Sequence, residues 1–146
     1  MTKKLVQVFK ILIITLIIAL MCKYCFAEVD LTIISSIESS NNPLAYNNKS
    51  EATGLYQITP ICLKDYNQYH SVKYTMTDMY DAQKCFVVAE WYLNDRIPSM
   101  LRYYGHTVDL NNTLVAYNWG IGHVGETLPK ETRDYIVKYR TLGVDR

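Results

Sequence analysis

The four prolines divide this chain into short segments, and their positions fit the starts and ends of helices. Proline has no backbone N–H to donate, so it suits the first turn of a helix and disrupts the interior. Apolar residues have helical spacing over residues 31–37, and Pro43 must end that helix. Thr59 directly before Pro60 predicts a helix that begins with a hydroxyl cap.

The remaining helices are expected from about Thr77 to Arg96 before Pro98, over Met100–Tyr104, from a cap at Asn111 or Asn112 through Leu114–Tyr117, and from Pro129 through Tyr135 and Tyr139. Strand signals are weak, because the chain has no long alternating run and no Asn-Gly or Asp-Gly turn. The polar stretch from Asn47 to Gly54 is expected to be a loop. The sequence therefore predicts one compact, mainly α domain.

The N-terminal segment has the pattern of a secretory signal peptide. Lysines precede the apolar run Ile11–Cys22, and the small residue Ala27 precedes the acidic Glu28. The run is shorter than the roughly 20 residues that a membrane-spanning helix needs. We therefore expect export to the periplasm or cell envelope, with cleavage after Ala27 and residues 28–146 left as the mature domain. Retention as an anchor is the alternative, because Cys25 is not the best residue for its place in the cleavage site.

Removal of residues 1–27 would change the net charge. That segment holds four of the 15 basic residues and none of the 14 acidic ones, so the mature chain would carry 11 − 14 = −3. No basic stripe remains to neutralise phosphates, and we therefore expect no nucleic-acid partner.

Two cysteines, Cys62 and Cys85, would remain in the mature chain. An even pair in an exported protein favours a disulfide, which would stabilise a small domain by about 3 kcal/mol. The alternative is two buried thiols that pack as small hydrophobic side chains.

Four separated strings carry most of the functional information: Ile37-Glu38-Ser39-Ser40-Asn41-Asn42-Pro43, Gly54-Leu55-Tyr56-Gln57-Ile58, Ala116-Tyr117-Asn118-Trp119-Gly120 and Glu131-Thr132-Arg133-Asp134-Tyr135. In this order they resemble the lytic transglycosylases with the goose-type-lysozyme-like fold, and the resemblance spans roughly Leu31 to Tyr139. It implies a mainly α, lysozyme-like single domain that cleaves the glycan strands of peptidoglycan and needs no cofactor.

Glu38 is the candidate catalytic residue. It is expected in the last turn of an amphipathic helix, where the helix dipole and partial burial both disfavour a carboxylate and raise its pKa. A carboxylic acid that stays protonated near neutral pH can protonate a glycosidic oxygen. A solvated surface glutamate is the alternative for this residue type on its own. The resemblance places the family's catalytic glutamate at Glu38.

Six further residues match the family's strings and are expected to bind substrate: Ser39, Gly54, Gln57, Tyr117, Asn118 and Tyr135. Each also has a structural alternative. Ser39 could bond a free carbonyl at the helix end instead of a sugar or the glutamate. Gly54 is expected to let a turn pass close to substrate, and Gln57 is either a ligand of an acetamido group or a loop-stabilising side chain. Both tyrosines could instead be core residues with satisfied hydroxyls.

Ordinary glycosidases use two carboxylates, and no second one is singled out here. The candidates are Glu51, Asp65, Glu126, Glu131 and Asp134. The resemblance implies that one glutamate is enough: it acts first as acid and then as base on the muramic acid 6-hydroxyl, giving a 1,6-anhydro product. The alternatives are a hydrolytic muramidase, which uses water, and a glycan-binding component without turnover.

Two positions depart from the family pattern. Tyr56 replaces the usual methionine and Trp119 a smaller residue, and both are expected to narrow or re-line the cleft. No metal site is expected, because the histidines lack metal-ligand spacing. The small single domain is compatible with service to an envelope-spanning secretion or conjugation machine, or to the machinery by which a phage enters a cell.

Overall fold

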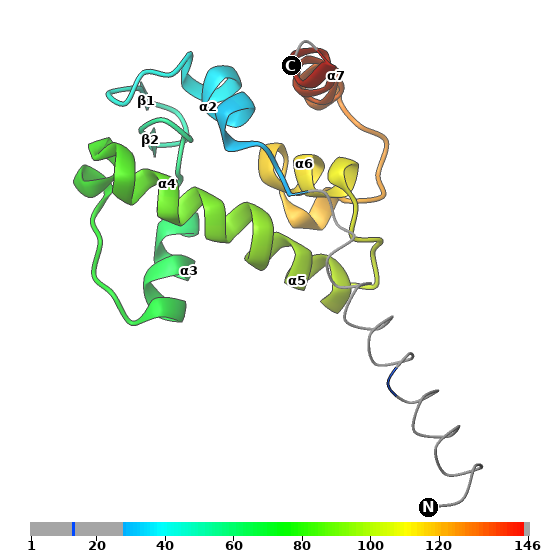
Figure 1. Cartoon of the computed structure of the whole chain (residues 1–146), viewed down its shortest axis with the longest axis horizontal. Coiled ribbons are helices and arrows are strands. Elements are labelled where there is room, and N and C mark those ends of the chain that lie inside the picture. The colour runs from blue at the N-terminus through cyan, green and yellow to red at the C-terminus, as the bar shows by residue number, and fades with distance from the viewer. Residues whose placement is uncertain (1–12, 14–27, 145–146) are drawn as a thin grey trace, which may run out of the picture.

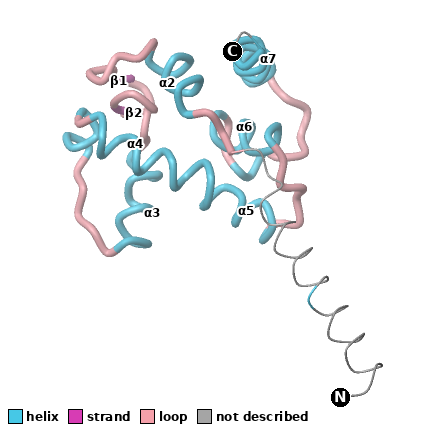
Figure 2. The backbone as a smooth tube through the Cα atoms, viewed as in Figure 1, coloured by secondary structure: helices cyan, strands magenta, loops and turns pink. Residues whose placement is uncertain are grey.

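The computed structural model describes residues 13 and 28–144. The predicted signal peptide therefore lies outside the described residues, except for Ile13, and cleavage after Ala27 stays a prediction. Among the residues that are described, no helix is both long and apolar enough to cross a membrane. The described body is mainly helical, which confirms the predicted fold class, and its only strands are two very short ones (Figure 2).

Helix α2 (Leu31–Ser39) carries the first functional string. It begins at Asp30, whose carboxylate accepts a hydrogen bond from the Thr32 amide at 2.8 Å. It ends at Ser40, which adopts a left-handed conformation with φ 53°. The predicted end before Pro43 is confirmed, and the chain then turns into a short antiparallel pair, β1 (Tyr46–Asn47) and β2 (Ala52–Thr53). Apart from Tyr46, this pair lies within the segment from Asn47 to Gly54 that was expected to be a loop.

Helix α3 (Pro60–His70) begins as predicted, with the Thr59 hydroxyl accepting from the Cys62 amide at 3.4 Å. A 3-10 turn η1 (Met76–Tyr80) then leads to α4 (Ala82–Trp91). The first residue of α4 follows Asp81, whose carboxylate accepts from the amides of Gln83 and Lys84. The expected helix start near Thr77 is therefore a separate turn.

The prediction that the long helix ends before Pro98 is wrong. A π turn η2 (Tyr92–Arg96) joins α4 directly to α5 (Ile97–Tyr103), so one long helical rod crosses the centre of the molecule (Figure 1). In the π turn the Ile97 amide donates to the Tyr92 carbonyl, five residues back. This change of register places Pro98 in the first turn of α5, where its missing N–H costs no interior hydrogen bond.

Helix α6 (Leu110–Asn118) is capped by Asp109, which accepts from the Asn112 amide at 2.8 Å, and not by Asn111 or Asn112 as predicted. A short turn η3 (Ile121–His123) follows, and α7 (Lys130–Val144) begins after Pro129 as expected.

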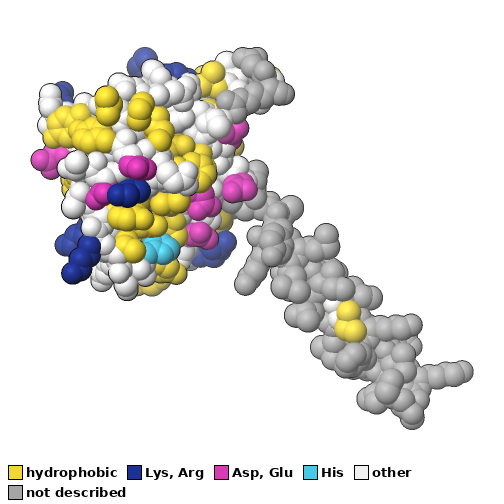
Figure 3. Space-filling view, turned by 60° about the vertical axis from the view of Figure 1, so that its left-hand side comes forward, with side chains coloured by type: hydrophobic (Ala, Val, Ile, Leu, Met, Phe, Trp, Pro, Cys, Tyr) yellow, Lys and Arg dark blue, Asp and Glu magenta, His cyan; other side chains and the backbone are white. Residues whose placement is uncertain are grey.

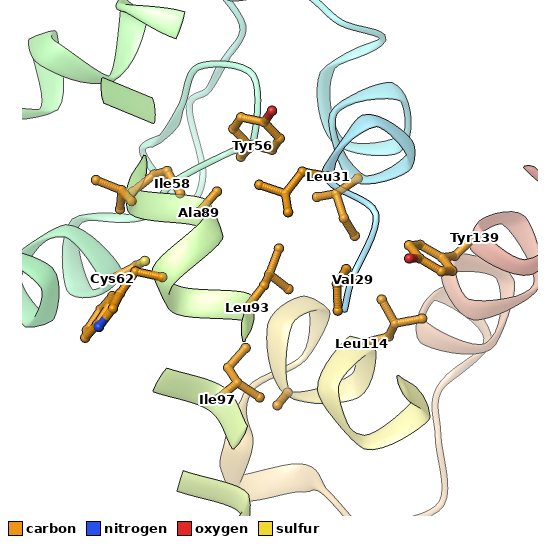
Figure 4. Packing of buried hydrophobic residues seen from close by; sticks show 14 of the residues in the cluster. Val29, Leu31, Tyr56, Ile58, Cys62, Ala89, Leu93, Ile97, Leu114 and Tyr139 are labelled. Atoms are coloured by element: carbon orange, nitrogen blue, oxygen red, sulfur yellow. The ribbon is translucent and has the colours of Figure 1, made fainter. Parts of the chain in front are cut away.

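The core forms around the central rod. Buried side chains from α2, η2, α5, α6 and α7 converge there: Leu31, Leu93, Ile97, Leu114 and Tyr139 (Figure 4). The Tyr139 hydroxyl also accepts a hydrogen bond from the Asp30 amide at 2.8 Å, which fixes α7 to the start of α2. That contact determines how the last helix faces the first functional string.

Cys62 and Cys85 are both buried and free, so the predicted disulfide is wrong and the alternative of two packed thiols holds. The Cys85 thiol instead accepts backbone hydrogen bonds from Leu55 and Tyr56. The loop that carries the second functional string is therefore attached to α4 through this sulfur.

Candidate active site

Glu38 lies in the last turn of α2 and points toward α7. The Tyr135 hydroxyl donates a hydrogen bond to its Oε1 at 2.8 Å, joining residues that are 97 positions apart in the sequence. Tyr135 is itself only 7% exposed, so the phenol is held in place by packing. This hydrogen bond brings the first and fourth strings together.

Burial is the main influence on the pKa of the Glu38 carboxyl. Loss of hydration raises its pKa to about 7, while the Tyr135 hydrogen bond and the positive charge of Lys138 act in the opposite direction. A carboxylic acid with this pKa is partly protonated at neutral pH and can both give and take a proton. The pKa of Glu38 is thus raised in the direction that its sequence context indicated, with burial as the main cause.

Glu38 lines a groove on the protein surface. One hollow of about 400 Å³ is lined by Glu38, Gln57, Tyr92, Tyr117, Asn118 and Glu131, together with residues of β2 and α3. A second, more open hollow of about 660 Å³ also includes Glu38, and it continues over Ser39 and Tyr46. Both hollows share Asn47 and Gln57, so they form one continuous depression with Glu38 near its middle.

Ser39 and Gln57 line this groove but make structural contacts as well. The Ser39 hydroxyl donates to the Leu55 carbonyl at 2.8 Å, so it ties α2 to the second string and does not bond Glu38. The Gln57 amide donates to the Gly54 carbonyl at 3.1 Å, which supports the loop-stabilising alternative. Both residues are still among those that line the groove.

Gly54 is not among the residues that line the groove, so the structure gives no support to its predicted place near substrate. Its φ is +83°, and a Cβ there would lie 2.0 Å from the Met79 carbonyl oxygen. The missing side chain therefore allows close packing of this loop against η1.

Tyr117 and Asn118 both line the groove at the end of α6. The Tyr117 hydroxyl donates to the Tyr56 carbonyl at 2.6 Å, which connects the third string to the second. Burial and the nearby charge of Glu38 raise the pKa of Tyr117 well above its ordinary value, so the phenol stays neutral and keeps its proton.

The two bulky departures from the family pattern do not re-line the groove. Tyr56 is 6% exposed and packs edge-on against the exposed ring of Phe86. Trp119 stacks on His123 with ring centroids 4.2 Å apart, and neither ring is part of the groove lining. Tyr56 is buried and Trp119 is half-buried on His123, so neither ring narrows the groove as expected.

Of the five candidate second carboxylates, Glu131 alone lines the groove with Glu38, and its side chain is exposed. Three others pair with basic side chains elsewhere: Asp65 with Arg96, Glu126 with His123 and Asp134 with Lys130. Within residues 28–144 no three potential ligand side chains are grouped to hold a metal ion.

Sequence reasoning missed Tyr92, Asn47 and Ser50 as groove residues. Tyr92 reaches the groove because the π turn changes the side-chain register of the central rod. Hydrophobic periodicity does not predict a π turn. The one sequence signal of an irregularity there was Pro98, six residues after Tyr92.

The chain matches one known protein family. The model of one family, the transglycosylase SLT domain, matches residues 15–138. The chain belongs to this family. Transglycosylase SLT domains act on peptidoglycan and have a lysozyme-like fold, in agreement with the helical body and the groove. The same comparisons found no curated protein and no solved structure that matches.

Proposed function

We propose that this transglycosylase SLT domain cleaves the β-1,4 bond between N-acetylmuramic acid and N-acetylglucosamine, with Glu38 as its one acid/base. The observation that carries the proposal is the Tyr135–Glu38 hydrogen bond in a groove where the Glu38 pKa is raised to about 7. Protonated Glu38 gives its proton to the glycosidic oxygen as the bond to the muramic C1 breaks. The substrate's own N-acetyl group stabilises the positive centre.

In the second step the Glu38 carboxylate accepts the proton of the muramic acid 6-hydroxyl, whose oxygen forms the new bond to C1. The product is a 1,6-anhydro sugar, and Glu38 returns to its protonated state. An internal hydroxyl that is already positioned has a large advantage over bulk water. The absence of a second buried carboxylate from the described groove lining supports this route.

Hydrolysis is the second candidate, and Glu131 is the observation that favours it. Glu131 lies in the first turn of α7, on the described groove wall, and is the one other carboxylate there that could activate a water. Mass spectrometry of products from purified sacculi separates the two reactions. We expect anhydro-muropeptides, whereas products heavier by one water would show a muramidase.

Replacing Tyr135 by phenylalanine tests how Glu38 is tuned. The Tyr135 hydrogen bond lowers the Glu38 pKa against the larger effect of burial, so its removal is expected to raise that pKa further above 7. The alkaline limb of the kcat/KM–pH profile should then move to higher pH, with kcat about tenfold lower because the carboxyl loses its fixed orientation. An unshifted profile would show that the hydrogen bond is not made during turnover.

We also propose that the domain works outside the cytoplasm, where peptidoglycan is found, after export directed by residues 1–27. The apolar run and the small residue at Ala27 support this proposal. We further propose that the domain works with an envelope-spanning secretion or conjugation machine, or with the machinery by which a phage enters a cell. The small size of the domain is compatible with this role.

A further inference from the structure

The central rod continues beyond the groove as an exposed surface that the proposed reaction does not use. Tyr92 of η2 lines the groove that holds Glu38. One turn later, Arg96 lines a separate hollow of about 310 Å³, together with Ser99, Met100, Tyr103 and Tyr104 of the following helix. The positive charge of Arg96 acts on the Tyr92 hydroxyl, so the two side chains lie near each other and the hollow lies beside the Tyr92 end of the groove.

Two tyrosines dominate this hollow. Tyr103 is 84% exposed and Tyr104 is 59% exposed, although their rings contact each other edge to face with centroids 5.1 Å apart. Each ring thus has a neighbour that restricts its rotation and a face that is open to solvent. On the face shown in Figure 3, hydrophobic side chains gather in patches between acidic and basic side chains. The tyrosine pair is distinguished by its hollow and by its position next to the groove.

Arg96 is the residue of the hollow that is nearest in sequence to Tyr92 of the groove, and an ion pair holds it in place. Its guanidinium donates to both carboxylate oxygens of Asp65 on α3, at 2.6 and 3.2 Å. A paired arginine is less able to attract a free anion, but it retains a flat, polar surface with further N–H donors. Such a surface suits neutral hydroxyl and acetamido groups better than a phosphate.

We propose that this hollow, the tyrosine platform (Arg96, Ser99, Met100, Tyr103 and Tyr104), is a distal glycan-binding site that holds the strand beyond the bond that Glu38 cleaves. The faces of sugar rings carry C–H groups, which pack on the electron-rich faces of aromatic rings. From residue 92 to residue 103 a helix rises about 16 Å, a span longer than a single sugar ring. A long linear glycan is therefore the ligand that can contact the groove and the platform together. This inference rests on the proposed function for its substrate class.

The test measures binding without turnover, so that it does not depend on which reaction Glu38 performs. Full-length protein carrying Glu38→Gln is incubated with purified peptidoglycan sacculi, and the bound fraction is measured by sedimentation over a concentration series. Adding Tyr103→Ala is expected to weaken binding about fivefold, and adding Tyr104→Ala as well should weaken it further. Tyr103→Phe should restore binding, because the ring and not the hydroxyl makes the contact.

Val137→Ala is the surface control, since Val137 is 62% exposed on α7 and lies in a different hollow. It should bind sacculi like the parent. The same series on glycan strands freed of their peptide stems should show the same losses. Unchanged binding by the double alanine variant would overturn the platform, and so would losses confined to strands that keep their stems. Retained cleavage by Glu38→Gln would contradict the proposed mechanism, whereas unchanged binding by the double alanine variant would contradict the platform alone, so the two failures are distinguishable.

Discussion

Replacing Glu38 by glutamine is expected to reduce cleavage of purified peptidoglycan by about 10³-fold or more. Glutamine keeps the size of the side chain but has no proton to give to the glycosidic oxygen and no base to accept one afterwards. The effect should be large because the other carboxylate on the described groove wall, Glu131, is exposed and lacks the burial that raises the Glu38 pKa. Release of soluble muropeptides over time is the measurement.

Glu126→Gln provides the matched control, because Glu126 is exposed, pairs with His123 and lies outside the groove. It should cleave like the parent. Thermal unfolding shows whether Glu38→Gln is folded.

The pH dependence of the variant's stability relative to the parent can also be predicted. Burial raises the Glu38 pKa from 4.5 to about 7, so the carboxyl favours the folded state at low pH and this contribution is lost above pH 7. The variant should therefore be more stable than the parent at pH 8, and the gain should disappear below about pH 4.5. Full cleavage by folded Glu38→Gln would refute the assignment.

Gly54→Ala is expected to lower the free energy of unfolding by about 3 kcal/mol. Two effects combine at this position. The φ of +83° is strained for any residue with a side chain, and the new Cβ would lie 2.0 Å from the Met79 carbonyl oxygen and 3.0 Å from the Cys85 sulfur. A backbone oxygen cannot rotate away, so η1 or the loop must move. Cleavage should fall as well, because the same loop supplies the carbonyls that Ser39 and Tyr117 bond.

Gly105→Ala separates the two effects. Gly105 has a φ of +75° but nothing lies within 4 Å of its missing Cβ. Its replacement should cost about 1 kcal/mol, from backbone strain alone. Chemical denaturation of both variants gives the comparison, and equal losses would show that the contact with Met79 is not limiting.

Helix ends were predictable wherever one residue determined them. Thr59 and Pro60 define the start of α3, and Pro129 precedes α7, because caps and prolines act on their immediate neighbours. Pro98 misled for a physical reason: a proline is compatible with a continuing rod when a π turn shifts the register just before it. That adjustment depends on how η2 packs between α3 and α6, and local sequence does not encode it.

The candidate site shows a similar division. The resemblance identified Glu38 and Tyr135 from separate strings. In the structure the Tyr135 hydroxyl lies 2.8 Å from Oε1 of Glu38. It did not distinguish residues that contact a ligand from residues that position the site. Gly54 belongs to the second group, since its role depends on a carbonyl 25 positions later that only the fold brings near.

The central claim is that a single buried carboxyl, held by a phenol, stays largely protonated up to neutral pH. Titration of the Glu38 side-chain carbon by NMR, with glutamate labelled in its carboxyl group and Glu38→Gln used to assign the signal, measures this directly. The account predicts a midpoint near 7. A midpoint at the ordinary value of 4.5 would contradict it, because Glu38 would then be ionised where it must donate its proton.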